Sequence, residues 1–405
     1  ALSPGAADEL AAWLQRNAEG NPYILGELVR LARDEGALGP DGGLGAALAA
    51  SPVVPPSVYS LIEARLARLS DEARRVLDAA VAAGRVFEFE VVARAAALSE
   101  AAALDALDEL RAARVVEPLP DGSLRFDHTL TMEVAYREVG EPRHRMLHRR
   151  VGEALEALHR DRLDAVAGLI ASHLAEGGAH ERAASFARLA GRRAASVAAW
   201  AEAIAFYEQA LAGAPAAERS AIVAALGDAL FLGGETARAA ERYRELLQLA
   251  RTPAEAAQAR INLARALIPQ GRYAEVIALV RDLRPAAPEE GWVALFIWGT
   301  ALSVEGADLA EAALRLRAAE RLVAEQPAPD AVALAQIRFE LGSVAAQQGD
   351  LPRAVAYYHE ALAVADGAAD DPQAVEGALT WRILARNNLA YHLLRLGYAP
   401  GAARY

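Results

Sequence analysis

The histidine at position 128 stands where a short extended run meets a helix. Residues 121–136 read DGSLRFDHTLTMEVAY: a turn signal, an alternating run that ends in Phe126-Asp127-His128, and then an apolar pattern of helical period. A histidine at such a junction can serve packing, metal binding, catalysis or the recognition of a phosphate. The local sequence leaves all four roles open.

A second group of ionisable side chains lies in residues 141–159, EPRHRMLHRRVGEALEALH. His144 and His148 are four residues apart, as in a helical metal pair, but there is no H-E-x-x-H motif and no evident third ligand. The four arginines between residues 143 and 150 suit either a phosphate patch or the solvated face of a connecting helix. Nearby carboxylates favour the solvated face, and we predict no metal site.

The composition excludes several chemistries. All 42 basic residues are arginine, so the P-loop lysine and lysine-based catalysis are absent. There is no cysteine, which removes disulfides, thiolate zinc sites and thiol nucleophiles. Histidines and carboxylates remain, without a recognisable catalytic motif. We therefore expect no catalytic residues and no enzyme activity in this piece.

The charge balance argues against nucleic acid as a direct partner. The net charge is −12, with 18 arginines against 25 acidic residues up to position 160 and 24 against 29 beyond it. No apolar run approaches 18 residues and no signal peptide opens the chain, so we expect no membrane contact and a cytoplasmic location. The chain starts at alanine and ends inside a helical pattern, which suggests an excised piece of a larger protein.

The residue pattern predicts an all-α fold with one small β-hairpin. Alanine dominates the 54% hydrophobic content and only 6% of residues are aromatic. Ser70 and Ser99 are expected to cap helices, and the runs VVEPL and SLRFDH to form the hairpin. The expected domains are a helical end and linker, a winged-helix-like domain, a connecting helix and a helical repeat array, at 1–56, 57–140, 141–163 and 164–405.

The third helix of the winged-helix outline would enter the major groove in a DNA-binding domain. Here it carries four acidic side chains against two arginines, Arg111 and Arg114. The acidic residues are Glu100, Asp105, Asp108 and Glu109. We expect this helix to repel DNA.

Small residues repeat through the second half of the chain. The marks lie 36, 37, 35, 43 and 48 positions apart, at Ala198, Gly234, Gly271, Gly306, Gly349 and Gly397. Another small residue precedes each mark by seven positions, at Gly191, Gly227, Ala264, Gly299, Gly342 and Ala390. With Ala203-Tyr207-Ala210 and Ala354-Tyr358-Ala361, this outline resembles the tetratricopeptide repeat. Each helix pair leaves an apolar face for a neighbour, so a stacked α-solenoid, truncated at its C-terminus, is predicted over 164–405.

In that register, certain positions of the first helices face a groove. They combine apolar rings with a few charges, which suits a protein, peptide or small-molecule inducer; an ordinary solvated concave surface is the alternative. The positions are Arg188, Arg192, Asp228, Phe231, Arg265, Phe296, Phe339, Asn387 and Tyr391.

The order of elements resembles the C-terminal half of STAND regulatory ATPases, in the style of maltose-regulon activators. The matching features are GNPYILGELVRLARDEG, the winged helix, the hairpin, Asp127-His128-Thr129-Leu130 and the repeats. The resemblance implies that Gly20, Asn21 and Pro22 lie by the adenine and that His128 reaches the ADP β-phosphate. Thr129 stands where the family has Asp, and Asp127 where it has Met.

The same resemblance implies an upstream nucleotide-binding domain that holds ATP or ADP with magnesium in the full-length protein. No cofactor is expected in this piece, because it lacks the phosphate-binding loop. The inducer would control the nucleotide switch from the repeat groove. A tetratricopeptide scaffold without nucleotide dependence is the main alternative, and an enzyme using carboxylates and histidines ranks last.

Overall fold

The structure is a computed structural model that describes residues 11–15, 22, 25–26, 28–29, 56–283, 288–306, 308–368 and 375–405. Its contacts divide the chain into two compact units. Unit 1 comprises Ala1–Arg193 and Gln209–Ala214, and unit 2 comprises Ala194–Glu208 and Pro215–Tyr405. Gly20 and Asn21 lie outside the described residues, as does most of the predicted segment 1–56; Pro22 is helical and exposed.

Unit 1 contains the predicted winged-helix-like arrangement, with the chain order α5, β1, α6, α7, β2, β3. Two serine caps are confirmed: Ser70 accepts a hydrogen bond from the Ala73 N–H, and Ser99 from the Ala102 N–H. The helices of unit 1 up to the connecting helix are α4 (Pro56–Leu66), α5 (Asp71–Ala83), α6 (Phe89–Ala96), α7 (Glu100–Ala112), α8 (Thr129–Glu138) and α9 (Glu141–Leu158).

The small sheet has three antiparallel strands, where the sequence predicted a two-stranded hairpin. β2 (Val116–Pro118) and β3 (Leu124–Phe126) form that hairpin. β1 (Val86–Phe87) pairs with the other edge of β3, giving the order β1-β3-β2. The sequence did not identify β1 because it is two residues long and its pairing with β3 is not local.

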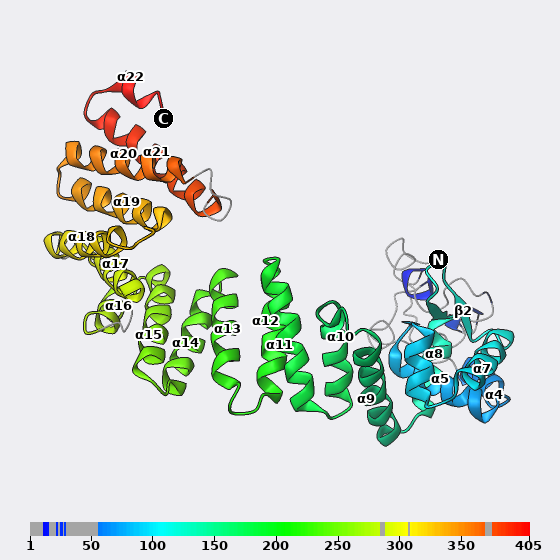
Figure 1. The fold of residues 1–405 in the computed structure, drawn as a ribbon. Helices are drawn as coiled ribbons and strands as arrows, with labels where there is room; N and C mark the ends of the chain where they lie inside the picture. Colours follow the sequence, from blue (N-terminus) through cyan, green and yellow to red (C-terminus); the bar gives the residue numbers. More distant parts are fainter. Residues whose placement is uncertain are drawn as a thin grey trace, which may run out of the picture. The chain divides into compact units, whose positions relative to one another are not determined.

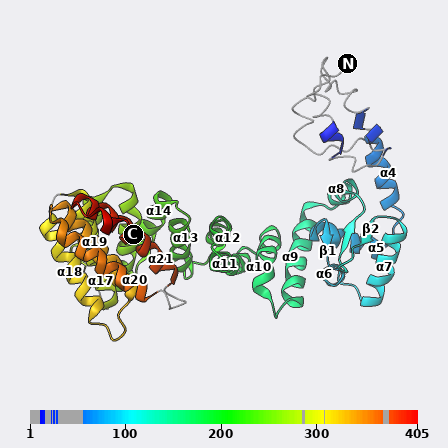
Figure 2. The same cartoon turned by 90° about the horizontal axis from the view of Figure 1, so that it is seen from above.

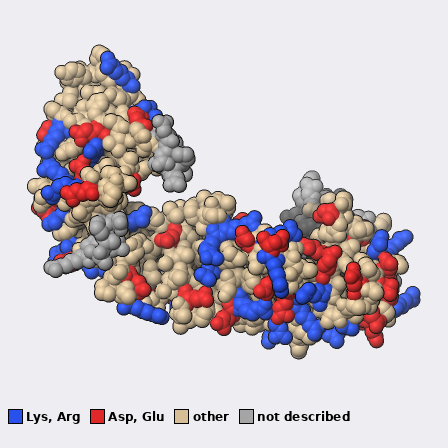
Figure 3. All heavy atoms as spheres, viewed as in Figure 1, with Lys and Arg blue, Asp and Glu red and all other residues tan. Residues whose placement is uncertain are grey.

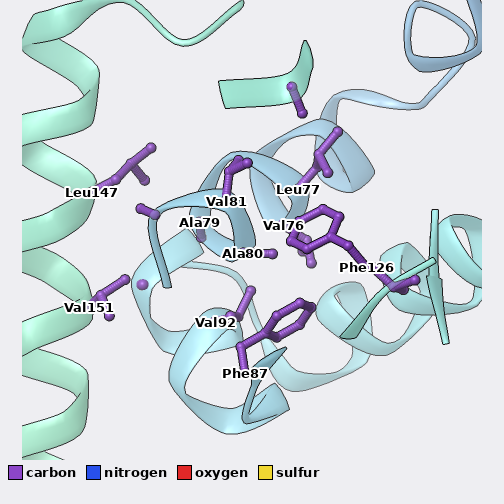
Figure 4. Packing of buried hydrophobic residues seen from close by; sticks show 14 of the residues in the cluster. Val76, Leu77, Ala79, Ala80, Val81, Phe87, Val92, Phe126, Leu147 and Val151 are labelled. Atoms are coloured by element: carbon purple, nitrogen blue, oxygen red, sulfur yellow. The ribbon is translucent and has the colours of Figure 1, made fainter. Parts of the chain in front are cut away.

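The core of unit 1 lies between the winged-helix-like elements and α9. Figure 4 shows Leu147 and Val151 of α9 beside the apolar side chains of α5 and α6, while Phe87 and Phe126 close the core from the sheet. The two rings are 5.7 Å apart. The connecting helix predicted at 141–163 therefore belongs to the first core, which also holds β3, two residues before His128.

After α9 the chain consists of helix pairs. Figures 1 and 2 show that the pairs of unit 2 follow one another in sequence order. The helices from α10 to the C-terminus lie in both units. They are α10 (Leu163–Glu176), α11 (His180–Ser196), α12 (Trp200–Gly213), α13 (Arg219–Leu232), α14 (Thr236–Leu249), α15 (Pro253–Leu267), η1 (Ile268–Gln270), α16 (Tyr273–Val280), α17 (Pro288–Glu305), α18 (Leu309–Ala324), α19 (Ala331–Gln347), α20 (Leu351–Gly367), α21 (Val375–Arg395) and α22 (Ala399–Ala402). The predicted all-α fold with a tetratricopeptide-type α-solenoid is confirmed.

The repeat marks found in the sequence are the turns between the two helices of each pair. All six have positive φ, from 56° at Ala198 to 86° at Gly234. At Gly349 the Asp350 N–H donates to the Ala345 carbonyl at 3.0 Å. This is the hydrogen bond of a Schellman motif, in which a residue in the left-handed region ends a right-handed helix. Glycine recurs there because a side chain disfavours this conformation.

The small residues seven positions before the marks let the two helices of a pair approach closely. A Cβ added at Gly227 would lie 2.7 Å from the Tyr243 ring, and one added at Gly342 would lie 2.7 Å from the Tyr358 ring. Gly299 has the same relation to Leu316. These contacts explain why the sequence repeats a small residue there and a large one about 16 positions later.

Ala198 is the mark without a glycine, and we expect Ala198→Gly to stabilise the protein by about 1 kcal/mol. Ala198 is exposed at φ 56°, so the substitution removes backbone strain without removing a contact. Chemical denaturation measures the change. The control Ala205→Gly, at an exposed position inside α12, should destabilise by about 1 kcal/mol. Equal effects of both substitutions would contradict the role assigned to the turn.

The first helices of the pairs line the inner surface of unit 2. α15, α17, α19 and α21 contact one another in succession. Among the described residues, the second helices α14, α16, α18 and α20 make at most marginal contacts with one another. Helices on the inside of a curved stack lie closer together than those on the outside, so these contacts place the first helices on the inner side of the stack.

Candidate functional site

His128 is the N-cap of α8. Its Nδ1 accepts a hydrogen bond from the Leu130 N–H at 3.2 Å, and the residue is 9% exposed. In the neutral ring an accepting Nδ1 leaves the proton on Nε2. His128 thus has a structural role as a cap, and its tautomer presents an Nε2–H donor.

Arg65 connects α4 with the residues around His128. Its Nη2 donates to Thr131 Oγ1 at 2.9 Å, and its Nη1 lies 3.8 Å from Asp127 Oδ2. The Arg65 Nε–H is buried and has no hydrogen-bond partner among the residues that the structure describes. Burial raises the pKa of Asp127, although Arg65 acts in the opposite direction. A donor without a partner next to a capping histidine suits an anionic ligand better than a cation.

A cavity of about 710 Å³ opens beside Asp127, between the end of α7 and β2. Arg111 and Arg114 line it together with Asp108 and Glu117. The lining is mixed in charge, and Figure 3 shows acidic and basic atoms interspersed over the visible face of unit 1. The predicted acidic character of α7 is retained, with Glu100, Asp105 and Asp108 exposed.

The histidines of the run 141–159 contact different partners. His144 Nε2 lies 2.9 Å from the Tyr136 carbonyl oxygen, and the two rings stack at 4.0 Å. His148 Nδ1 lies 3.0 Å from Nδ1 of His173 on α10, and both residues are buried. Burial lowers the pKa of His148 and lowers that of His173 to about 4. Within the described ranges, no group of three or more possible ligands could hold a metal ion.

On the inner surface of unit 2, a polar stripe follows α19. Gln336, Glu340, Ser343 and Gln347 are four, three and four residues apart, which places them on one helical face. Gln347 Nε2 donates to Ser303 Oγ of α17 at 3.1 Å, so the stripe faces the preceding first helix. On α17, Thr300 stands one turn before Ser303; it is 9% exposed, and its Oγ1 has no hydrogen-bond partner in the described part of the chain.

A second part of the inner surface joins α13 and α15. The Arg265 guanidinium lies over the Phe231 ring, 5.1 Å from its centroid. The Tyr243 hydroxyl donates to Asp228 at 2.7 Å. Burial and this hydrogen bond raise the pKa of Tyr243. Three residues predicted for the groove, Asp228, Phe231 and Arg265, are therefore neighbours.

The remaining groove predictions divide. Asn387 is exposed on α21, Tyr391 is 55% exposed, and Phe296 is partly buried on α17. Phe339 was wrong as an open groove position: it is 9% exposed, with Tyr358 and Trp381 at centroid distances of 5.3 and 5.4 Å. The register placed it correctly on a first helix, but α21 covers it.

Two predicted groove residues belong to the other unit. Arg188 and Arg192 lie on the part of α11 that is in unit 1, half-buried and exposed respectively. The groove described for unit 2 therefore begins at Asp228.

Sequence reasoning did not identify Thr300, Ser303, Glu340 and His392. His392 on α21 is 5% exposed and stacks on Tyr358 at 5.5 Å, and no described residue forms a hydrogen bond with its Nδ1. Burial lowers the pKa of His392 and raises that of Glu340 to about 7. The spacing of the α19 stripe was the available signal, since four of the five polar residues of this helix share one face and only Arg338 lies elsewhere.

Comparison with known proteins gives distant structural similarities. No protein-family model and no curated protein matches the chain. The fold is similar to that of a STAND protein with a tetratricopeptide repeat sensor from Pyrococcus horikoshii, with 13% identity, 100% of this chain and 58% of that one covered, and a TM-score of 0.43. The quorum sensor NprR from B. thuringiensis shows 12% identity, 68% and 91% coverage, and a TM-score of 0.43.

A third similar structure is MamA from Desulfovibrio magneticus, with 16% identity, 46% and 97% coverage, and a TM-score of 0.38. The chain spans only 58% of the Pyrococcus protein. The fold described here is established by the helix order and turn geometry. Over the described ranges, no helix has the length and apolar character needed to cross a membrane.

Proposed function

We propose that this chain is the sensor and regulatory part of a cytoplasmic STAND signal-transduction ATPase. The repeat groove binds an inducer, and this binding controls an ADP/ATP switch in the full-length protein. Such control requires the inducer to bind the closed and open states with different affinity. Catalysis resides in the upstream nucleotide-binding domain, because this chain has no P-loop lysine.

The observation that carries the proposal is the pattern of unsatisfied polar atoms on the inner helices. Buried polar groups in folded proteins normally have hydrogen-bond partners. Thr300 Oγ1 and His392 Nδ1 have none among the described residues, and they lie on first helices on either side of the α19 stripe. Both atoms are buried in this structure, so a ligand would supply the missing partners by displacing the side chains that cover them, and such a displacement would change the packing of the inner helices.

The nucleotide part of the proposal is supported by His128 and Arg65. The Nε–H of Arg65 has no hydrogen-bond partner among the described residues, and a nucleotide supplies anionic phosphate oxygens that accept such a bond; the family resemblance implies the His128 contact. These residues fit a phosphate contact. The predicted adenine contacts Gly20 and Asn21 lie outside the described residues, and they remain part of the proposal with Pro22.

The test is His128→Asn in the full-length protein. Asparagine is a good N-cap, so α8 should keep its capping bond, while the shorter side chain loses the Nε2–H donor. A hydrogen bond to a charged group contributes at least about 1.5 kcal/mol. We therefore expect inducer-independent activity to rise about tenfold, with the melting temperature of this chain unchanged.

His128→Ala serves as the comparison, because it removes both the cap and the donor. It should also raise basal activity, and in addition destabilise this chain by about 1 kcal/mol. If His128→Asn leaves basal activity unchanged, the histidine only caps α8. The chain is then better described by the alternative, a tetratricopeptide scaffold that binds protein partners without nucleotide.

A further inference from the structure

The α19 stripe contains one charged side chain, the carboxylate of Glu340. Its stripe neighbours Gln336 and Ser343 are uncharged. Within the described ranges, Glu340 makes no ion pair, whereas Arg338 binds Glu320 at 2.8 Å on another face of the same helix. A carboxylate that is largely removed from water and lacks a counter-charge is unfavourable. Burial accordingly raises the pKa of Glu340 to about 7.

One aromatic ring, that of Tyr358, lies near this carboxylate, and Tyr358 belongs to a group of contacting rings. Phe339 contacts Tyr358 and Trp381, and Tyr358 stacks on His392 with an interplanar angle of 12°. Glu340 is close enough to Tyr358 to raise the pKa of its hydroxyl, although burial is the larger cause. A carboxylate beside aromatic faces is a favourable environment for an organic cation, because charge pairing and cation–π attraction act together.

Charged side chains on four of the five first helices from α13 to α21 point to an extended ligand. Asp228 lies on α13, Arg265 on α15, Glu340 on α19 and Arg395 on α21. Neighbouring packed helices are about 8–10 Å apart, which an extended peptide spans in about three residues. A peptide can therefore satisfy several of these positions at once, whereas a small molecule reaches one or two.

We propose that the inner face of α17, α19 and α21 binds a peptide through a basic side chain, whose guanidinium or ammonium group pairs with Glu340. This inference rests on the proposed function and names the class of its inducer. Thr300 on α17 and His392 on α21 lie on the neighbouring first helices, but their Oγ1 and Nδ1 atoms are buried, so the inference rests on Glu340. An acidic peptide residue about three positions away would pair with Arg395.

The pH dependence of binding follows from the groups that face this site. They are Glu340 of α19, Tyr358 of α20, and His392 and Arg395 of α21; the α17 residues Thr300 and Ser303 do not titrate. Burial keeps Tyr358 neutral and lowers the pKa of His392, so Glu340 is the group that ionises as pH rises through 7. Affinity should rise about tenfold between pH 6 and pH 8.

A selection from a random heptapeptide phage library tests the proposal, with the intact chain as bait. Glu340→Gln and Glu360→Gln are parallel baits, and Glu360 is the matched control because it is exposed and 3.9 Å from Arg338. Peptides selected by the unsubstituted chain should share a basic residue. Synthetic versions should bind Glu360→Gln equally and Glu340→Gln at least about tenfold more weakly at pH 8. Glu340→Asp, which keeps the charge, should restore part of the affinity.

Three outcomes would overturn the inference: selected peptides without a basic residue, peptides that bind Glu340→Gln undiminished, or no enrichment. The proposed function is tested separately by Phe231→Ala and Arg265→Ala. Peptides that bind these two variants more weakly but bind Glu340→Gln with unchanged affinity would refute the inference. The proposal of a sensor that binds its ligand in the groove would not be contradicted. If no peptide is enriched, or if the peptides bind all groove variants with unchanged affinity, both the inference and the proposal that the groove binds a peptide are refuted.

Discussion

Glu340→Gln is expected to stabilise α19, and the gain should be about 2 to 3 kcal/mol larger at pH 8 than at pH 5. In the native protein, burial raises the pKa of Glu340 from 4.5 to about 7. The unfolded chain therefore releases this proton at lower pH than the native chain does. Stability from Glu340 is present below about pH 4.5 and is lost as pH rises toward and through 7. Glutamine has no charge to desolvate, so it removes this loss.

Native-state hydrogen exchange measures the effect locally, as the opening free energy of the amides in α19 after correction for the intrinsic rate at each pH. Glu360→Gln on α20 is the control, since that side chain is 53% exposed and its replacement should show no such pH dependence. A Glu340→Gln gain that is constant from pH 5 to pH 8 would show that Glu340 is already ionised or paired in the native state. The cation site would then lose its electrostatic basis.

The repeat architecture was predictable because its signals are local. A residue with positive φ between two helices selects glycine, and a tight helix contact selects a small residue against a large one at fixed spacing. Both constraints act within one helix pair, so they recur in the sequence at Gly234, Gly349, Gly227 and Gly342. The serine caps Ser70 and Ser99 were predictable for the same reason.

The candidate site was less predictable because its properties depend on neighbouring helices. Phe339 and Asp228 were both assigned to the groove from the register, yet α21 covers Phe339 while Asp228 stays exposed. Glu340 looks like an ordinary surface residue until its missing partner and its burial are known. The capping role of His128 was also hidden, since histidine is not among the usual N-cap residues.

Acidification is expected to destabilise α9 and α10 by about 2 to 3 kcal/mol between pH 7.5 and pH 4.5. His148 and His173 share one proton between Nδ1 atoms 3.0 Å apart, and burial lowers the pKa of His173 to about 4. The native pKa is lower than the unfolded value of 6.5, so the unfolded chain takes up protons first. The stability is full above about pH 6.5 and is lost as pH falls toward 4.

His173→Gln tests this expectation, because glutamine keeps polar atoms near His148 but does not titrate. Opening free energies of α9 and α10 amides, from hydrogen exchange, should then vary much less with pH. The groups facing the pair are Glu176, 3.2 Å from His148 Nε2, and His144. Glu176 favours a protonated His148. Titration of His148 should therefore leave a small pH dependence of the opening free energies in the His173→Gln variant.

The matched control is His180→Gln, at an exposed position at the start of α11, which should leave the pH dependence of α9 and α10 unchanged. If the opening free energies of α9 and α10 vary with pH as strongly in His173→Gln as in the unsubstituted chain, His173 is not kept neutral by its burial beside His148. The acid response would then arise elsewhere in unit 1. Acid thus acts on α9 and α10 in the direction opposite to its effect on α19, because protonation charges a buried histidine pair in one place and neutralises a half-buried carboxylate in the other.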